Sequence, residues 1–117
     1  MWIYRDCLVV MEVNTFLVGA SKSGTTTLSN ILSSHPEICM CPIKEPNYFS
    51  DDLPADVFSE PHARNLEEYH KLWTNIDDGH SLVCEASVGY FYSEDASENI
   101  RNYNPEAKIL VILRHPV

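Results

Sequence analysis

The fold of this chain is most clearly indicated by one segment, Thr15-Phe16-Leu17-Val18-Gly19-Ala20-Ser21-Lys22-Ser23-Gly24-Thr25-Thr26-Thr27. It begins with a short apolar run that ends at Gly19, which is typical of a buried parallel strand. After Gly24, apolar residues at spacings of three and four predict a helix that ends before His35-Pro36, because a residue preceding proline avoids the helical region. The apolar residues of that helix are Leu28, Ile31 and Leu32. A strand, a loop bounded by two glycines and a helix therefore follow one another directly.

The rest of the chain alternates between apolar runs and helical patterns. Strands are predicted over Ser81–Glu85 and Lys108–Leu113, and the second is expected to be buried on both faces because its apolar side chains do not alternate with polar ones. Helices are predicted over residues 65–75, capped by the opening asparagine, and over 94–103. The proline-rich stretch 36–64 is expected to be irregular. Strands separated by helices indicate a parallel sheet of the α/β class.

The length of the chain and its last strand together indicate one incomplete domain. The chain has 117 residues, which is enough for one domain and too few for two. A parallel strand needs a helix to cover its face, yet only Arg114-His115-Pro116-Val117 follow the last predicted strand. We expect residues 1–117 to form the N-terminal portion of a single larger domain that is incomplete at its C-terminus.

Charge and hydropathy exclude several function classes. The chain has 8 Lys and Arg residues against 17 Asp and Glu residues, a formal net charge of −9. A field of this sign repels phosphate-rich partners, so no nucleic acid or anionic membrane is expected to bind. No apolar run is long enough to span a bilayer, and charged residues interrupt the first twenty, so neither a membrane segment nor a signal peptide is expected.

The cysteine and histidine patterns do not predict a metal site. The four cysteines include no C-x-x-C pair, and no histidine lies at ligand spacing. We expect buried thiols in a reducing compartment, no metal cofactor, and histidines at the surface or in loops. The residues concerned are Cys7, Cys39, Cys41, Cys84, His35, His62, His70 and His80.

The loop between Gly19 and Gly24 has the chemistry of an anion site. Glycines let backbone N–H groups approach an oxyanion closely, and the following helix adds its unsatisfied N–H groups and positive dipole end. Lys22 adds a full positive charge. A nucleoside-triphosphate loop of the Walker type requires lysine directly after the second glycine, where this chain has Thr25. These residues therefore predict a phosphate or sulfate site and count against ordinary ATP or GTP hydrolysis.

The pattern strand–G-x-x-K-[ST]-G-[ST]-[ST]–helix resembles the phosphosulfate-binding loop of sulfotransferases that use 3′-phosphoadenylyl sulfate (PAPS). Three later segments resemble further motifs of this family in the same order, especially in its carbohydrate branch, which includes heparan sulfotransferases and bacterial relatives. These segments are Lys44-Glu45-Pro46-Asn47-Tyr48-Phe49, Glu85-Ala86-Ser87-Val88-Gly89-Tyr90-Phe91 and Lys108–Pro116. The resemblance spans roughly residues 15–117 and implies a fold like that of P-loop nucleoside triphosphate hydrolases, a parallel sheet with flanking helices.

The resemblance implies an enzyme that transfers a sulfuryl group from PAPS to a hydroxyl or amine of a carbohydrate or small-molecule acceptor, without a metal. Lys22 would stabilise charge on the leaving oxygen, and Glu45 would be the general base for the acceptor's proton. Arg114 would hold the 3′-phosphate, and if its strand neighbours the one ending at Gly19, both open on one crevice. The cofactor-binding residues are then Lys22, Ser23, Gly24, Thr25, Thr26, Thr27 and Arg114.

Two further charged residues are candidates for acceptor binding. Lys44 would either orient an acidic acceptor or balance Glu45. Glu85 ends its strand and would either contact the acceptor or be a carboxylate exposed to water. The family often has a lysine where this chain has Ala86, so a second cation near the substrate is in doubt. Aromatic residues of the matching segments are expected mainly in the core: Tyr48, Phe49, Tyr90 and Phe91.

Two other functions are compatible with the same loop. A P-loop nucleotide kinase or NTPase would need a lysine after Gly24, and a degenerate module would bind anions without catalysis. No feature of the sequence indicates a particular acceptor or an oligomeric state. We expect a cytoplasmic location, or the Golgi lumen if a eukaryotic anchor is missing from this fragment.

Overall fold

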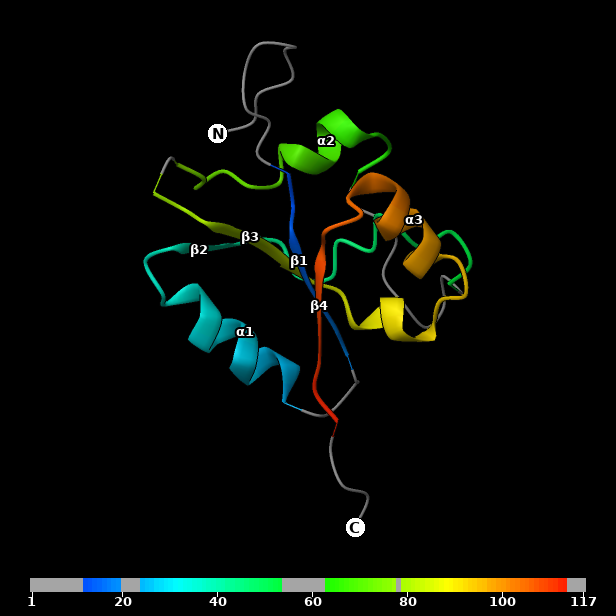
Figure 1. Cartoon of the computed structure of the whole chain (residues 1–117), viewed down its shortest axis with the longest axis horizontal. Coiled ribbons are helices and arrows are strands. Elements are labelled where there is room, and N and C mark those ends of the chain that lie inside the picture. The colour runs from blue at the N-terminus through cyan, green and yellow to red at the C-terminus, as the bar shows by residue number, and fades with distance from the viewer. Residues whose placement is uncertain (1–11, 20–23, 54–62, 78, 114–117) are drawn as a thin grey trace.

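The structure, a computed structural model, describes residues 12–19, 24–53, 63–77 and 79–113. Four parallel strands form one sheet in the order β2-β3-β1-β4, with helices beside it (Figure 1). The strands are β1 (Thr15–Gly19), β2 (Ile38–Met40), β3 (Leu82–Ala86) and β4 (Lys108–Val111), and the helices are α1 (Thr25–Ser33), α2 (Leu66–His70), the 3-10 helix η1 (Val88–Tyr92) and α3 (Ala96–Tyr103). The predicted α/β class with a parallel sheet is confirmed.

Strand β1 lies between β3 and β4 and fixes the register of both. Thr15 is opposite Cys84 of β3 and Lys108 of β4. Beyond the last paired residues, the Ile112 N–H donates to the Gly19 carbonyl oxygen at 2.7 Å. Because parallel strands end at the same edge of a sheet, the carboxyl ends of β1, β3 and β4 lie together.

The edge strand β2 was not predicted. It covers three residues, Ile38–Met40, inside the stretch expected to be irregular. Its pairing runs in parallel from Ile38 opposite Leu82 to Met40 opposite Cys84. A strand this short has no periodicity of its own, so its existence depends on the neighbouring strand that it pairs with.

The predicted helices are present, with shorter bounds for two of them. Asn65 caps α2 as predicted, because its side-chain oxygen accepts from the Glu68 N–H at 2.9 Å. The helix ends at His70, five residues before the predicted end. Beyond it the Leu72 and Trp73 N–H groups donate to carbonyls only three residues back, so the chain continues in 3-10-type turns instead of an α-helix.

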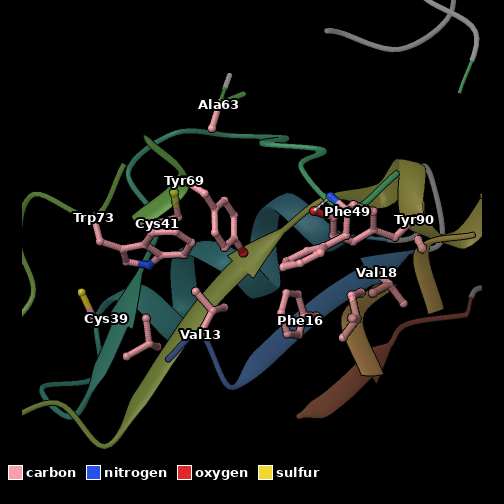
Figure 2. Packing of buried hydrophobic residues seen from close by; sticks show 13 residues of the cluster. Val13, Phe16, Val18, Cys39, Cys41, Phe49, Ala63, Tyr69, Trp73 and Tyr90 are labelled. Atoms are coloured by element: carbon pink, nitrogen blue, oxygen red, sulfur yellow. Dashed lines mark hydrogen bonds between the residues drawn. The ribbon is translucent and has the colours of Figure 1, made fainter. Parts of the chain in front are cut away.

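One face of the sheet, called the aromatic face here, is covered by a buried aromatic cluster (Figure 2). The Phe16 ring of β1 lies 5.7 Å from that of Phe49 in edge-to-face contact. Tyr69 of α2 makes the same kind of contact with Phe49 at 5.2 Å and with Trp73 at 5.0 Å. Such contacts stabilise beyond the area they bury. The buried members of the cluster are Val13, Phe16, Val18, Cys39, Cys41, Phe49, Ala63, Tyr69, Trp73, Val83, Tyr90, Ala96 and Ile100.

The opposite face of the sheet, called the α1 face here, is packed more lightly. Strand side chains alternate between faces, so Thr15 and Leu17 point away from Phe16 and toward this face. Helix α1 packs along β1 and β2, but it buries none of its own residues, and Ile31 is 61% exposed. The predicted apolar side of α1 is therefore only partly covered by the described residues.

The prediction that the last strand is buried on both faces is wrong for the described residues. All four residues of β4 are exposed, including Ile109 at 49% and Val111 at 45%. In this part of the chain, β4 is an edge strand with β1 as its strand neighbour, and no described helix packs extensively along it. A continuous apolar run indicates what a strand can bury, whereas actual burial depends on its neighbours.

One histidine is buried where the sequence predicted exposure, whereas the described cysteines are buried as predicted. His70 was expected at the surface, but it is 2% exposed in α2 and hydrogen-bonds the Tyr103 hydroxyl at 2.7 Å. Burial lowers its pKa to about 4. Cys39, Cys41 and Cys84 are buried free thiols, as expected. Measured over the described helices, none is long and apolar enough to cross a bilayer.

Candidate active site at the carboxyl edge of the sheet

The N-terminus of α1 is open at the end of β1. Gly24 has φ 91°, a left-handed backbone that glycine adopts without strain, and its carbonyl accepts from the Leu28 N–H at 3.0 Å. No described side chain caps this helix, its first turn has no acidic residue, and Thr26 and Thr27 are exposed. The N–H groups of its first turn, the positive dipole end and the hydroxyls fit the anionic group of a nucleotide such as PAPS.

Three of the predicted cofactor-binding residues, Lys22, Ser23 and Arg114, lie outside the described residues. The strands that lead toward them are described, and they are paired from Thr15 opposite Lys108 to Gly19 opposite Val111. The condition under which both strands open on one crevice, that they are neighbours, is therefore met. Their carboxyl ends therefore share one edge of the sheet.

Gly19 is required where β1 meets η1. A Cβ at this position would lie 2.8 Å from the Cβ of Phe91, closer than real Cβ atoms approach, and the φ of 153° is itself unfavourable for a side chain. The Phe91 side chain is 46% exposed, so this aromatic residue is not part of the core. Tyr90 and Phe49 are buried, as expected.

Glu45 is tied to the end of β3 by its backbone and its side chain. Its N–H donates to the Ala86 carbonyl at 3.1 Å, and its Oε2 accepts from the Val88 N–H at 2.8 Å. Burial raises the pKa of Glu45, and hydrogen bonds from the Val88 and Gly89 N–H groups oppose that rise. Because Ala86 is opposite Leu17 of β1, the Glu45 carboxylate lies at the edge of the sheet where β1 ends.

The backbone around Glu45 is strained. Glu45 has φ 55° and Asn47 has φ 54°, and both are residues with side chains in the left-handed region. Such conformations are uncommon outside glycine and persist where the surroundings hold them, often at functional sites. Lys44 precedes Glu45 and is exposed. The two possible roles of Lys44 both remain predictions.

Glu85 has a surrounding that the sequence did not indicate. It is 0% exposed, so the alternative of a carboxylate solvated at the strand end is wrong. Its carboxylate accepts hydrogen bonds from the hydroxyls of Tyr69, Ser87 and Tyr90. Burial raises the pKa of Glu85 to about 7, which the three hydroxyl groups oppose. Contact with an acceptor stays a prediction for this residue.

Sequence reasoning missed the hydroxyl groups around Glu85. Ser87 follows it by two residues in the chain, which was a readable signal, because that spacing returns a side chain to the same side of an extended segment. Tyr69 comes from α2, and no local pattern connects it with Glu85. Within the described ranges, no group of three or more His, Cys, Asp and Glu side chains is arranged to hold a metal ion.

Comparison with known proteins gives consistent relatives. The chain is 28% identical over 114 residues to heparan sulfate glucosamine 3-O-sulfotransferase 5 of Mus musculus, a match that covers 97% of this chain and 30% of that protein. It is 30% identical to the membrane-associated sulfotransferase kil1 of Dictyostelium discoideum, covering 89% of this chain and 21% of that protein. The chain thus spans less than a third of the length of these curated relatives.

A solved structure and a family model agree with these matches. A sulfotransferase from Alicyclobacillus acidocaldarius superposes with a TM-score of 0.77 at 33% identity, covering 87% of this chain and 44% of that one. This agreement supports the predicted fold, which is like that of P-loop nucleoside triphosphate hydrolases. The model of the sulfotransferase family matches residues 15–103, which is most of the chain. This chain, with its open helix N-terminus and its tethered carboxylate at one sheet edge, belongs to the sulfotransferase family.

Proposed function

We propose that the protein is a sulfotransferase that moves a sulfuryl group from PAPS to a hydroxyl or amine of a carbohydrate or small-molecule acceptor. The proposal is carried by one observation: a helix N-terminus without a described side-chain cap and a partly buried carboxylate are both placed at the carboxyl edge of the sheet. The first follows β1, and the second, on Glu45, is bonded to the end of the adjacent strand β3. An anion site beside a proton acceptor is what sulfuryl transfer requires.

The donor side of the site is formed by the start of α1 and the residues before it. When bound, PAPS supplies the sulfuryl group and leaves as the desulfated nucleotide PAP. The first-turn N–H groups and the hydroxyls of Thr25 and Thr26 donate to its anionic oxygens. Lys22 stabilises the charge that develops on the leaving oxygen, and Arg114 binds the 3′-phosphate. The pairing of β1 with β4 supports this arrangement, because those strands lead toward these two residues.

The acceptor side of the site is formed by Lys44 and Glu45. The Glu45 carboxylate takes the proton that the acceptor hydroxyl or amine loses as it attacks sulfur. Burial makes this carboxylate a stronger base than a glutamate in water, while the Val88 N–H keeps it oriented. Lys44 is exposed beside it, where it can attract an acidic sugar. Relatives named as heparan sulfate sulfotransferases support a carbohydrate as the acceptor.

Nucleotide binding to the full-length protein tests the donor side. We expect isothermal titration calorimetry to show PAP binding that Lys22→Ala weakens by about a hundredfold, the loss of one charged hydrogen-bonding partner. Lys71→Ala is the matched control, since Lys71 is an exposed lysine of the C-cap of α2, and it should leave PAP affinity unchanged. Tighter binding of ATP with Mg²⁺ than of PAP would overturn the proposal in favour of a kinase or NTPase.

Transfer of labelled sulfate from PAPS to carbohydrate acceptors tests the chemistry. We expect Glu45→Gln to lower kcat by about a hundredfold or more, as removal of a general base does, with PAP affinity retained. Glu98→Gln, at an exposed position of α3, is the matched control and should be fully active. PAP binding without transfer to any hydroxyl or amine acceptor would instead indicate an anion-binding protein.

A further inference from the structure

The segment that carries Glu45 is held by two buried hydroxyl groups. The Asn47 N–H donates to Ser87 Oγ at 3.0 Å, and the Phe49 N–H donates to the Tyr90 hydroxyl oxygen at 3.2 Å. Ser87 is 0% exposed and Tyr90 is 5% exposed. Both hydroxyls belong to the segment that follows β3, so this segment is hydrogen-bonded to the backbone after Glu45 at two positions, Asn47 and Phe49.

The direction of these hydrogen bonds decides where the hydroxyl protons go. A backbone N–H can only donate, so each hydroxyl accepts with a lone pair and keeps its own proton to donate further. Ser87 Oγ donates to Oε1 of Glu85 at 2.6 Å, and the Tyr90 hydroxyl donates to Oε2 at 3.1 Å. The buried Glu85 carboxylate is therefore the common acceptor of two hydrogen-bond relays. One runs from the Asn47 N–H through Ser87, and the other from the Phe49 N–H through Tyr90.

The two hydrogen-bond relays hold a segment whose backbone conformation is unfavourable. Glu45 and Asn47 both have positive φ, a conformation that persists only when neighbouring groups fix it. The relays reach Asn47 and Phe49, two and four residues after Glu45. The Val88 N–H binds the Glu45 side chain from the same stretch as Ser87 and Tyr90. Backbone and carboxylate are thus fixed by one rigid partner.

We propose that Glu85 is a positioning residue for Glu45. Through the hydroxyls of Ser87 and Tyr90, its carboxylate holds the backbone at Asn47 and Phe49 and keeps the Glu45 carboxylate aimed at the acceptor's proton. Glu85 does this from the core and does not touch the acceptor. The inference rests on the proposed role of Glu45 as the general base.

Tyr69 supplies a matched control for the relays. Its hydroxyl donates to the same Oε2 of Glu85, but it comes from α2. Tyr69→Phe therefore removes a buried phenol hydroxyl from the same carboxylate and leaves both relays in place. Tyr90→Phe makes the identical chemical change within a relay, and Ser87→Ala removes the other relay with a smaller change in volume.

The test compares these three variants in the full-length protein. We expect Tyr90→Phe and Ser87→Ala to lower kcat by about tenfold or more, because small misplacements of a catalytic group are costly, with acceptor KM and PAP affinity changed by less than about twofold. Amide hydrogen exchange should accelerate at Phe49 and Asn47, respectively. Tyr69→Phe should lower the stability to urea as much as Tyr90→Phe does while kcat changes by less than about twofold.

Glu85→Gln tests the shared acceptor directly. The amide has one oxygen in place of two and an NH₂ group that cannot accept, so it cannot receive both hydroxyl protons from opposite sides. We expect faster exchange at both Asn47 and Phe49 and a kcat loss at least as large as either single relay variant gives. If this variant does not fold, the two relay variants still decide the matter.

Two results would overturn the inference, and they are distinguishable. If Glu45→Gln abolishes transfer while Tyr90→Phe and Ser87→Ala keep full kcat, or if kcat falls equally in Tyr69→Phe, then Glu85 only stabilises the fold. If Glu45→Gln is fully active, the proposed base is wrong and its positioning residue with it, even where amide exchange shows that the relays exist.

Discussion

The two faces of the sheet differ in how they are packed, although the same strands form both. On the aromatic face, rings from β1, α2, η1 and the segment after β2 interlock, and a charged side chain, Glu85, is buried among them. On the α1 face, a single described helix lies along two strands and buries no residue of its own. The aromatic face holds the residues that position Glu45, the proposed proton acceptor, whereas the α1 face carries the helix of the proposed anion site.

This contrast separates two ways of building a site. Groups that must point in one direction before the reaction, such as the Glu45 carboxylate, are attached to the rigid face. A helix N-terminus needs little support of its own, because its N–H groups and dipole are aligned by the helix itself. Changes on the aromatic face should therefore affect stability more than equivalent changes on the α1 face.

Two adjacent core residues give the largest expected losses of stability. Phe16 and Leu17 are 0% and 1% exposed but point to opposite faces. We expect Phe16→Ala to lower the unfolding free energy by about 4 kcal/mol and Leu17→Ala by about 3 kcal/mol, since α1 can move into the cavity more easily than interlocked rings can. Urea denaturation measures both. A larger loss for Leu17→Ala would contradict the contrast between the faces.

Much of the fold, and less of the site, could be predicted from the sequence. The apolar runs before Gly19 and at Lys108 identified two strands, although not that they are neighbours, and Asn65 identified a helix start. The burial of β4 could not be predicted, because it depends on which elements lie beside it. The surroundings of Glu85 could not be predicted either, because its partners Tyr69 and Tyr90 meet it only after α2 and η1 have packed.

Buried titrating groups on the aromatic face should make stability depend on pH in two opposite directions. The pKa of Glu85 is raised from 4.5 to about 7, so its contribution is present below pH 4.5 and is lost as the pH rises through 7. The pKa of His70 is lowered from 6.5 to about 4, so its contribution is present above pH 6.5 and is lost as the pH falls through 4. On the α1 face, burial raises the pKa of Cys84 to about 11, outside this window.

Single variants should separate the two contributions, each about 3 kcal/mol over its window. Urea unfolding of Glu85→Gln should show stability rising with pH between 4 and 6.5, because the opposing contribution of Glu85 to that of His70 is then removed. His70→Gln should show the reverse, with stability falling between pH 4.5 and 7. Parallel pH curves for both variants and the unmodified protein would contradict the assignment of these two groups.

The two glycines around the anion loop provide the smallest expected losses of stability. Gly19→Ala places a Cβ against that of Phe91, whereas a Cβ at Gly24 meets no atom of the described residues within 4 Å. We expect thermal unfolding to show a loss of about 2 kcal/mol or more for Gly19→Ala and of about 1 kcal/mol, from backbone strain alone, for Gly24→Ala. Phe91→Ala should not rescue Gly19→Ala, because alanine keeps the clashing Cβ. Equal losses would mean that η1 yields to the new methyl group.

The left-handed backbone at Glu45 and Asn47 bears on any effort to make this protein more heat-resistant. Substitutions that remove the backbone strain of this turn would be expected to raise stability, yet they would also free the Glu45 carboxylate from the orientation that the turn maintains. Durability is better sought on α1, where Ile31 stands largely in water and its replacement disturbs neither relay. In this member of the family, heat stability should therefore be adjustable through α1 without changing kcat, which depends on the turn at Glu45 and Asn47.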